Sequence, residues 1–465
     1  MRTILIPVSN GFFVRNGLRT DFLQVLKETP DLRVVFLAPA EKIAYYREQF
    51  SAPNLLFEEI PPVDHPTIEK FFKLLEAASI HTATTRSIQF YYFYRKGSQD
   101  RFPIRLASFI LQRACALLGS FRAWRAFIRL AYASVPDQSC AELFQKYKPD
   151  LVFCPTLIYG NEYVLLRDAL RRGVPTIGMT SSWDNLYSKT FLRVSPDLLF
   201  VQTPILKEQA ALRADYPPDR VRIIGVPQYD PYFRKEGLLS REEFAERLGA
   251  DPSKKILLYA FSGKVGMDID FAMLDLLNDA MKKGELPSDL QVFVRPYPKR
   301  DFSPAKVEKI KKQYGFVVAS ASFQFGVGKD SWEFDASSLS LLSNSLFHSD
   351  IVVSTYSTFF IEAAIFDRPL IAVGFDADPG TDYWNSARRF FEWDHLADIK
   401  ALGAVDIASS RADFLCAVHE AVAHPEARRA ARAAIVGEQC AYTDGKSGER
   451  LADELLSSLL KSSHE

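Results

Sequence analysis

Short apolar runs alternate with longer amphipathic stretches along both halves of the chain. In the first half, the apolar runs predict strands at residues 3–8, 32–37, 151–153, 176–179, 198–201 and 222–224. The stretches between them predict helices, for example at 21–28 and 161–172. In the second half we expect a helix at 241–248 and strands at 255–260, 291–294, 315–319, 351–353 and 370–373. Buried strands that alternate with helices are typical of a parallel sheet covered on both faces.

Pro227, Pro231 and Gly237 interrupt this alternation near the middle of the chain. The same pattern on both sides of the break predicts an α/β protein with two Rossmann-like doubly wound domains that face a cleft. Ligands of such sheets bind beyond the carboxyl ends of the strands. The expected parts are an N-terminal domain at 1–226 with a helical insertion at about 64–140, a linker at 227–254, a C-terminal domain at 255–440 and a C-terminal helix at 441–465.

The segment from Arg86 to Arg129 departs from this rhythm. It holds nine basic residues, one acid (Asp100) and ten interleaved aromatic residues. Its last arginines, Arg122, Arg125 and Arg129, follow helical spacing. Cationic helices with bulky apolar residues bind the headgroup region of anionic bilayers, so an anionic membrane surface is one expected partner. The alternative is a helical hairpin that packs on the domain with its arginines in solvent. Nucleic acid is not expected, because no RNA-binding motif accompanies the charges.

Composition excludes several classes of protein. The 57 basic and 57 acidic residues cancel, so the molecule as a whole does not attract polyanions. Five scattered cysteines disfavour a disulfide framework or a zinc site and favour a reducing compartment. The chain starts with a strand pattern instead of a signal peptide, and no uncharged apolar run reaches membrane-spanning length. We therefore expect a cytoplasmic protein, at most peripheral on the inner face of the cytoplasmic membrane.

The segment from Ser349 to Val373 carries the most informative functional pattern. It predicts a buried strand, a loop rich in hydroxyl groups, a helix with Glu362 and a second buried strand. A hydroxyl-lined loop that opens a helix suits a phosphate, because free N–H groups and the positive dipole end meet there. Glu362, about one turn further on, is expected to hold a ribose diol. The alternative is an ordinary βαβ unit whose serines only cap the helix. The expected donor-binding residues of this segment are Ser354, Ser357, Thr358 and Glu362.

Two further loops follow predicted strands of the second half. Ser262 and Gly263 come directly after the strand at 255–260, where a glycine lets the backbone approach a ligand. Arg295 ends the strand at 291–294 and is followed by two prolines. A guanidinium held there can bind a diphosphate in bidentate fashion. A plain turn and a structural ion pair are the respective alternatives.

These motifs together resemble a known family. The run Arg295-Pro-Tyr-Pro, the Ser-Asp-Ile-Val that begins at Ser349, the hydroxyl loop, the Glu-Ala at Glu362 and the Arg-Pro-Leu-Ile at Arg368 resemble the C-terminal domain of GT-B-fold enzymes. They are most similar to bacterial surface-polysaccharide transferases of the CDP-glycerol glycerophosphotransferase type. Non-hydrolysing UDP-sugar 2-epimerases share the architecture. The resemblance covers residues 255–375 well and 145–235 loosely.

The resemblance implies roles for individual residues. It implies that the loop with Arg295 faces the donor phosphates, with Tyr297 where the family has histidine. It implies that Ser357 and Thr358 are the hydroxyls of the second motif and that Glu362 is the ribose-binding carboxylate. Enzymes of this fold neutralise the leaving diphosphate with basic side chains and a helix end. Since the histidines and the Asp-x-Asp runs form no metal-ligand pattern, no metal or other cofactor is expected, and a nucleotide-activated sugar serves as co-substrate.

The N-terminal half is expected to bind the acceptor. In the loop after the strand at 176–179, Asp184 is the expected general base for an acceptor hydroxyl, and the neighbouring Trp183 is expected to stack on a sugar ring and raise the pKa of Asp184. The alternative is an Asx turn beside a buried tryptophan. Glu162, at a helix start, is a second possible base. The expected acceptor-binding residues are Asn10, Arg15, Trp183 and Asn185.

The leading functional hypothesis is a glycosyltransferase, or a related phospho-alcohol transferase, in bacterial surface polysaccharide synthesis. Asp184 deprotonates a glycan or lipid-linked acceptor, and Arg295 stabilises the leaving phosphate. One alternative is a UDP-sugar 2-epimerase, against which Tyr297 in place of histidine argues. The other is a catalytically silent protein that binds a glycan or a nucleotide.

Overall fold

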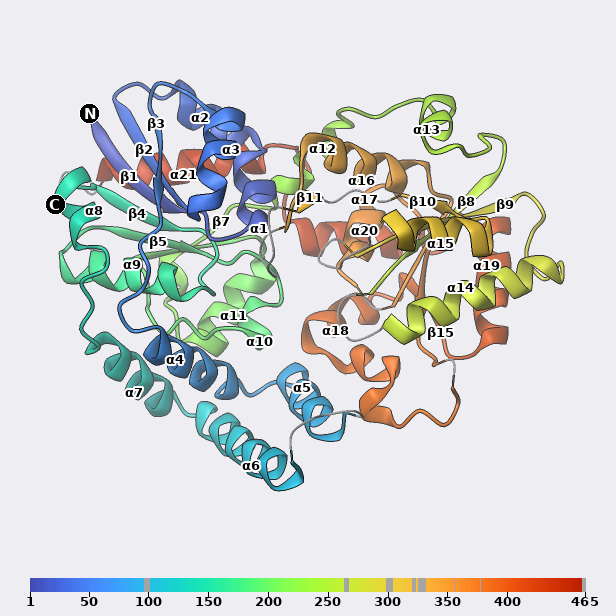
Figure 1. Cartoon of the computed structure of the whole chain (residues 1–465), viewed down its shortest axis with the longest axis horizontal. Coiled ribbons are helices and arrows are strands. Elements are labelled where there is room, and N and C mark those ends of the chain that lie inside the picture. Colours follow the sequence, from blue (N-terminus) through green and yellow to red (C-terminus); the bar gives the residue numbers. More distant parts are fainter. Residues whose placement is uncertain are drawn as a thin grey trace. The chain divides into compact units, whose positions relative to one another are not determined.

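The computed structural model describes residues 1–95, 101–262, 267–297, 304–319, 323–324, 332–355, 357–376 and 378–461. The chain divides into two compact units (Figure 1). Unit 1 comprises Met1–Phe93, Gly97–Asp230 and Cys440–Glu465, and unit 2 comprises Tyr94–Lys96 and Pro231–Gln439. Each unit contains a parallel sheet with helices, which confirms the predicted α/β class with two Rossmann-like units.

Unit 1 is built on a seven-stranded sheet in the order β3-β2-β1-β4-β5-β6-β7, and every neighbouring pair is parallel. The order reverses between β1 and β4, so the crevice of this sheet opens beyond their carboxyl ends. The pattern analysis missed β3, an edge strand that ends in two glutamates and lacks a continuous apolar run. The strands are β1 (Arg2–Pro7), β2 (Leu32–Ala38), β3 (Leu55–Glu59), β4 (Leu151–Cys154), β5 (Thr176–Met179), β6 (Leu198–Val201) and β7 (Val221–Ile223).

Helices cover both faces of this sheet because alternate strand residues point to opposite sides. Ile4 and Ile6 of β1 join a core with α2, α3 and α21, whereas Leu5 joins a core with α4, α7, α8, α9 and α11. The helices of unit 1 are α1 (Gly11–Phe13), α2 (Asp21–Glu28), α3 (Ala40–Phe50), α4 (Pro66–Ala78), α5 (Ala83–Tyr94), α6 (Phe102–Gly119), α7 (Arg122–Ala133), α8 (Ala141–Tyr147), α9 (Gly160–Arg171), α10 (Asn185–Ser188), α11 (Pro204–Ala214) and α21 (Ser447–Lys461).

Unit 2 repeats the plan with a six-stranded parallel sheet in the order β10-β9-β8-β13-β14-β15. Its order reverses between β8 and β13. The strands are β8 (Lys255–Ala260), β9 (Leu290–Arg295), β10 (Val317–Val318), β13 (Ile351–Ser354), β14 (Leu370–Val373) and β15 (Val405–Ala408), and a separate antiparallel pair is formed by β11 (Phe323–Gln324) and β12 (Trp332–Glu333). The helices are α12 (Asp230–Arg234), α13 (Arg241–Leu248), α14 (Met267–Lys282), α15 (Pro304–Tyr314), α16 (Ala336–His348), α17 (Phe359–Ile365), α18 (Asp394–Ala401), α19 (Arg411–Ala423) and α20 (Arg429–Cys440).

The end of the chain returns to unit 1. Helix α21 packs against α2, with Leu451, Leu455 and Leu459 in the same core as Phe22. Its amino end is capped by the buried carboxylate of Asp230, which accepts hydrogen bonds from the N–H groups of Ser447 (3.0 Å) and Gly448 (2.7 Å). Residues 231–254, which sequence patterns assign to a linker, group with unit 2 and contain α13.

Helices α4, α6 and α7 pack against one another, and α4 packs against α9 on the sheet of unit 1 (Figure 1). The approach of α6 to the residue after α4 is very close: a Cβ atom on Gly119 would lie 1.6 Å from the carbonyl oxygen of Ser79. Only glycine permits this contact, so α6 is built into the fold at its carboxyl end.

Two of the three arginines on α7 do not face solvent. Arg125 and Arg129 form ion pairs with Asp215 at 2.6 and 3.1 Å, and Arg129 also donates to the carbonyl groups of Phe191, Leu192 and Ala214. Burial raises the pKa of Asp215, but the hydrogen bonds and charges of the arginines outweigh it and lower the pKa overall. The expectation that these charges attract an anionic surface is therefore wrong for Arg125 and Arg129. Helical spacing put the arginines on one face but did not reveal the partly buried Asp215 opposite.

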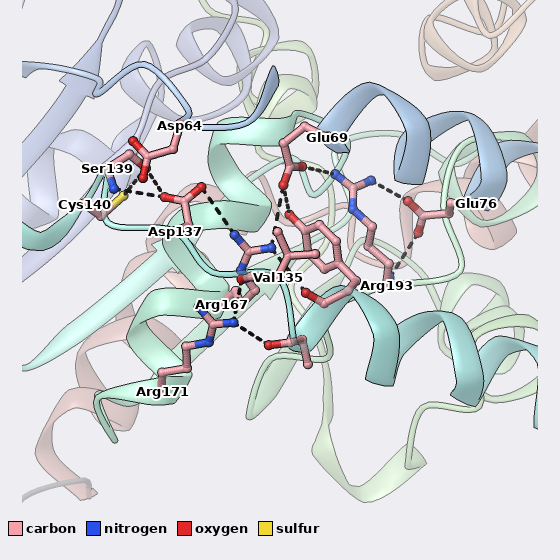
Figure 2. A network of polar contacts seen from close by, with 12 residues as sticks. Asp64, Glu69, Glu76, Val135, Asp137, Ser139, Cys140, Arg167, Arg171 and Arg193 are labelled. Atoms are coloured by element: carbon pink, nitrogen blue, oxygen red, sulfur yellow. Dashed lines mark hydrogen bonds and ion pairs between the residues drawn. The ribbon is translucent and has the colours of Figure 1, made fainter. Parts of the chain in front are cut away.

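A buried cluster of charges joins α4 to the chain after α10 (Figure 2). Arg193 donates to Glu76 (2.7 Å) and to Glu69 (3.2 Å), both from α4. Glu76 also accepts hydrogen bonds from the hydroxyl of Thr190 and from the backbone N–H groups of Phe191 and Arg193. Burial lowers the pKa of Arg193, but the two carboxylates, together with the rings of Tyr132 and Tyr163, raise it overall. The guanidinium is charged and buried, so its partners are essential to this packing.

Substitution of Glu76 tests how much this cluster contributes to the stability of the fold. Glu76→Ala leaves the charge of Arg193 buried with one partner fewer, so the free energy of unfolding is expected to fall by about 3–5 kcal/mol. Urea denaturation measures the loss. Glu208→Ala on the exposed side of α11 is the matched control and is expected to cost less than about 0.5 kcal/mol. Equal effects of the two substitutions would contradict the role given to the cluster.

Candidate functional site

The predicted donor residues of unit 2 lie along one edge of its sheet. Arg295 at the end of β9 pairs in register with Ala260 at the end of β8, and Ala260 pairs with Ser354 at the end of β13. These are the strands on both sides of the position where the strand order reverses. Open α/β sheets bind ligands beyond this position. Sequence and structure therefore bring the predicted donor motifs to one edge of the sheet of unit 2.

Arg295 is a buried guanidinium at this edge. Its side chain lies over the ring of Phe359, the first residue of α17, at 5.9 Å. The carbonyl group of Arg295 accepts a hydrogen bond from Phe261, which continues the pairing of β8 with β9. A planar guanidinium in a partly dry crevice interacts with a phosphate far more strongly than one in water.

The hydroxyl groups of the loop after β13 differ in their availability. Ser354 is buried and donates to the carbonyl group of Ala260, so it joins the two central strands. Ser357 is half-buried and accepts from the N–H group of Phe359, while Thr358 is exposed at the start of α17. Because α17 has only seven residues, its dipole adds less than that of a long helix. Among the described residues of this loop, Ser357 and Thr358 are the ones whose hydroxyl groups a ligand can reach.

The remaining donor predictions have partners within unit 2. The buried carboxylate of Glu362 accepts a hydrogen bond from the hydroxyl group of Tyr232 (3.0 Å), so a ribose diol has to share it with this tyrosine. Ser262 donates from its hydroxyl and its N–H group to the fully buried Asp270. Tyr297 is partly buried against the core of unit 2. Gly263 lies outside the described residues.

The predicted acceptor residues gather at the corresponding edge of unit 1. Side-chain amides from the three segments that follow β1, β4 and β5 lie beyond the ends of these strands. Asn16 donates to the carbonyl group of Ser181 (3.4 Å), and the hydroxyl group of Ser9 donates to Asn161 (3.4 Å). The amide of Asn185 lies against Ser181 and the carbonyl group of Thr156. The amide nitrogen of Asn10 is buried there without a hydrogen-bond partner within the described residues, while its oxygen accepts from Phe12.

This group of amides suits a ligand rich in hydroxyl groups, because each amide both donates and accepts hydrogen bonds. Asn16 and Asn161 were not predicted. The available signal was their position, since an asparagine follows each of the strands β1, β4 and β5. Arg15 is half-buried and donates to Asn16 at 3.2 Å.

Asp184 and Trp183 have surroundings that the sequence did not indicate. The carboxylate of Asp184 is partly exposed and forms an ion pair with Lys189 at 2.9 Å. Trp183 is partly buried and packs against the core that lies between the sheet and α9. An acceptor hydroxyl therefore has to compete with an ammonium group for Asp184.

Glu162 is a fully buried carboxyl group at the same edge. It accepts hydrogen bonds from the hydroxyl and N–H groups of Thr156 and from the N–H group of Leu157 (2.8 Å), a residue with left-handed backbone (φ 47°). Burial raises the pKa of Glu162 to about 6, although these hydrogen bonds and one from Ser9 lower it. Glu162 thus holds the loop after β4 in a strained conformation.

Within the described residues, no group of three or more His, Cys, Asp or Glu side chains is arranged to hold a metal ion.

Solved structures define the fold. S. aureus MnaA, in a co-structure with UDP, matches at a TM-score of 0.54 and 10% identity over 98% of this chain and 96% of that chain. UDP-GlcNAc 2-epimerase from Neisseria meningitidis, bound to UDP-GlcNAc, matches at 0.52 and 12% over 98% and 100%. The wall teichoic acid polymerase TagF matches at 0.49 and 11% over 100% and 90%, which is too low to carry an argument. At these identities the likeness concerns the fold alone, and that fold is GT-B.

The family follows from the sequence. Residues 192–457, more than half of the chain, match the family described as CDP-Glycerol:Poly(glycerophosphate) glycerophosphotransferase, and the chain belongs to it. A comparison with curated proteins finds no match. The resemblance predicted from the motifs is confirmed, and the chain is a transferase at the level of its family.

The pKa of Glu162 leads to a test of its structural role. Its pKa of about 6 exceeds the ordinary 4.5, so the protein binds this proton more tightly when folded. The protonated carboxyl group therefore adds to the free energy of unfolding. This contribution is fully present below about pH 4.5 and is lost as the pH rises through 6. Glu162→Gln lacks this dependence. Between pH 4.5 and 7.5, the free energy of unfolding of this variant is expected to rise relative to that of the wild type by on the order of 2 kcal/mol.

Urea denaturation at several pH values measures this difference. Glu142→Gln, an exposed glutamate on α8, is the control and is expected to show no such trend. A constant difference between Glu162→Gln and the wild type over this range would contradict the raised pKa.

Proposed function

We propose that the protein transfers a sugar, or a related alcohol phosphate, from a nucleotide-activated donor to a hydroxyl group of a glycan or lipid-linked acceptor in bacterial surface polysaccharide synthesis. Membership of the glycerophosphotransferase family supports this class of reaction. The observation that carries the proposal is the register of Arg295, Ala260 and Ser354 across the crevice of unit 2.

Unit 2 is the proposed donor unit. The guanidinium of Arg295 binds the diphosphate, and Ser357 and Thr358 donate to its oxygens. Glu362 holds the ribose together with Tyr232. During transfer, negative charge grows on the departing phosphate, and a fixed positive group stabilises that charge without reorganisation. In this proposal Arg295 supplies the charge, the reaction needs no metal, and the nucleotide donor is a co-substrate.

Unit 1 is the proposed acceptor unit. The amides of Asn10, Asn16 and Asn185 bind hydroxyl groups of the acceptor, and Asp184 removes the proton of the reacting one. The resulting oxygen attacks the activated centre of the donor. With a sugar donor the C1–O bond breaks and a nucleoside diphosphate leaves. With an alcohol-phosphate donor the bond between the two phosphates breaks and a nucleoside monophosphate leaves. Lys189 lies beside Asp184 and compensates its charge before the acceptor binds.

Nucleotide binding tests the donor half. Full-length protein is expected to bind at least one of CMP, CDP, UDP, GDP and ADP in a thermal-shift screen, because a bound ligand stabilises the folded state. Arg295→Met removes a charge-assisted contact and is expected to weaken binding of that nucleotide roughly ten- to hundredfold. Arg429→Met, which removes an exposed arginine of α20, is the control and is expected to bind normally. Unchanged affinity of Arg295→Met would overturn the donor assignment.

Turnover tests the acceptor half. With CDP-glycerol and a glycerophosphate-primed glycan lipid, Asp184→Asn is expected to lose about 10²–10⁴-fold in rate while its affinity for the nucleotide is kept. Asp219→Asn, an exposed aspartate of unit 1, is the control. Full turnover by Asp184→Asn would remove the base assignment. Exchange of a sugar C–H proton with D₂O from a UDP-sugar without acceptor would identify an epimerase instead, and nucleotide binding without any turnover would identify a silent binding protein.

A further inference from the structure

Helix α6 exposes an apolar face that no part of the described chain covers. Residues seven positions apart lie on one side of a helix. Ile104, Leu111 and Leu118 form one such row, Ile110 and Leu117 form a second, and all five side chains are exposed. Ala107 and Ala114 lie between the rows. Phe121, between the two helices, and Phe127 and Leu130 on α7 are also exposed. Scattered exposed leucines are ordinary, but a continuous apolar face marks a binding surface.

The exposed charges of this helical segment have one sign. In the described parts of residues 66–133, the only acids are Glu69 and Glu76, and both are buried in the cluster with Arg193. The exposed charged residues are all basic: Lys70, Lys73, Arg86, Arg101 and Arg122, of which Arg122 also forms an ion pair with Asp215 (3.1 Å). Burial of both carboxylates thus leaves only basic exposed charges on the described helices that carry the apolar face. Basic residues beside bulky apolar ones complement an anionic lipid surface.

Helix α6 has the length and composition of a membrane span, yet its contacts indicate a different orientation. Its 18 residues, of which 17% are buried, have a mean hydropathy of 1.2. That length corresponds to about 27 Å, somewhat less than the hydrocarbon thickness of about 30 Å. The helix contains Arg105 and Arg113, so it is not an uncharged apolar run.

One side of α6 is held by the rest of unit 1. Gly119 fits against the carbonyl oxygen of Ser79, and Cys115 and Ala116 are buried beside it. Arg113 donates to Gln89 and Arg105 donates to the carbonyl group of Phe93, so neither arginine is on the apolar face. A helix fastened along one side cannot leave the fold to cross a bilayer, but it can lie in the plane of its surface.

We propose that the exposed face of α6 and α7 inserts into one leaflet of an anionic bilayer, with α6 parallel to the membrane plane. Ile104, Ile110, Leu111, Leu117, Leu118 and Phe121 enter the acyl region, and the basic residues named above contact the headgroups. This locates the membrane surface on the apolar rows of α6 and not on Arg125 and Arg129. The inference adds a membrane to the proposed lipid-linked acceptor, but it does not depend on the donor chemistry.

Co-sedimentation with vesicles tests the proposal on the full-length protein without nucleotide. Wild-type protein is expected to bind vesicles of equal parts phosphatidylglycerol and phosphatidylcholine, and to bind pure phosphatidylcholine at least tenfold more weakly. The double variant Leu111→Glu/Leu118→Glu is expected to lose at least tenfold in partitioning, because two carboxylates replace inserted leucines. Both positions are exposed (65% and 43%), so the fold is expected to be kept.

Leu212→Glu is the matched control. Leu212 is as exposed (68%) but lies on α11, outside this face, and its replacement is expected to leave vesicle binding unchanged. Circular dichroism and the nucleotide thermal shift of each variant confirm folding and keep the membrane result separate from the donor assignment. Absence of wild-type binding, or equal binding by the double variant, would overturn the proposal. So would a lipid-free wild-type dimer that the double variant dissociates, because the face would then bind a second copy.

Discussion

The buried charge of Arg193 is the interaction on which the helical side of unit 1 depends. A guanidinium without water needs carboxylates, and α4 supplies two of them, Glu69 and Glu76, which lie about two turns apart on one side of the helix. The same contacts hold the backbone of residues 191–193, which follow α10 and so come shortly after Asp184 in the chain. The helical insertion is therefore bonded to the segment that follows the candidate catalytic loop. Because the carboxylates are used internally, they do not offset the basic residues at the surface of α4 to α7. The cluster around Arg193 thus holds the segment that follows the candidate catalytic loop, and it leaves the exposed charges of α4 to α7 basic.

The repeating units of the fold were predictable because burial on two faces leaves a strong trace in sequence. A central strand such as β1 reads as a continuous apolar run, and ten of the eleven predicted strands correspond closely to observed ones, with the eleventh, at 315–319, shortened to β10. Edge strands were harder to predict from sequence. The edge strands β3 and β15 were missed because they are polar on one side and are not fully buried. The helical insertion was predictable as helices, but its orientation was not. Spacing alone does not tell which side of α7 meets Asp215, a residue more than eighty positions away.

The same contrast applies to the candidate sites. Motifs that directly follow buried strands could be assigned to a crevice, since parallel strands end at a common edge, and Arg295 and Ser354 lie there. The sequence did not reveal which of these side chains already form hydrogen bonds or ion pairs within the protein. Ser262 is held by Asp270, Glu362 by Tyr232 and Asp184 by Lys189, and each partner comes from a different element or turn. The amides of Asn16 and Asn161 also escaped notice, because both lie in helical segments after β1 and β4 and belong to no motif that marks a site.

The capping of α21 by Asp230 has a consequence for how the protein is made. Residues 447–461 complete the core around Phe22 and Leu26, so the first domain to leave the ribosome lacks one of its covering helices until nearly all of unit 2 has been synthesised. During that interval the outer side of α2 is uncovered and prone to association with other nascent chains. Unit 2 has all of its strands in one uninterrupted stretch and is free of this delay. The late-synthesised domain is therefore the one expected to reach its native state unaided, whereas the early one awaits its final helix.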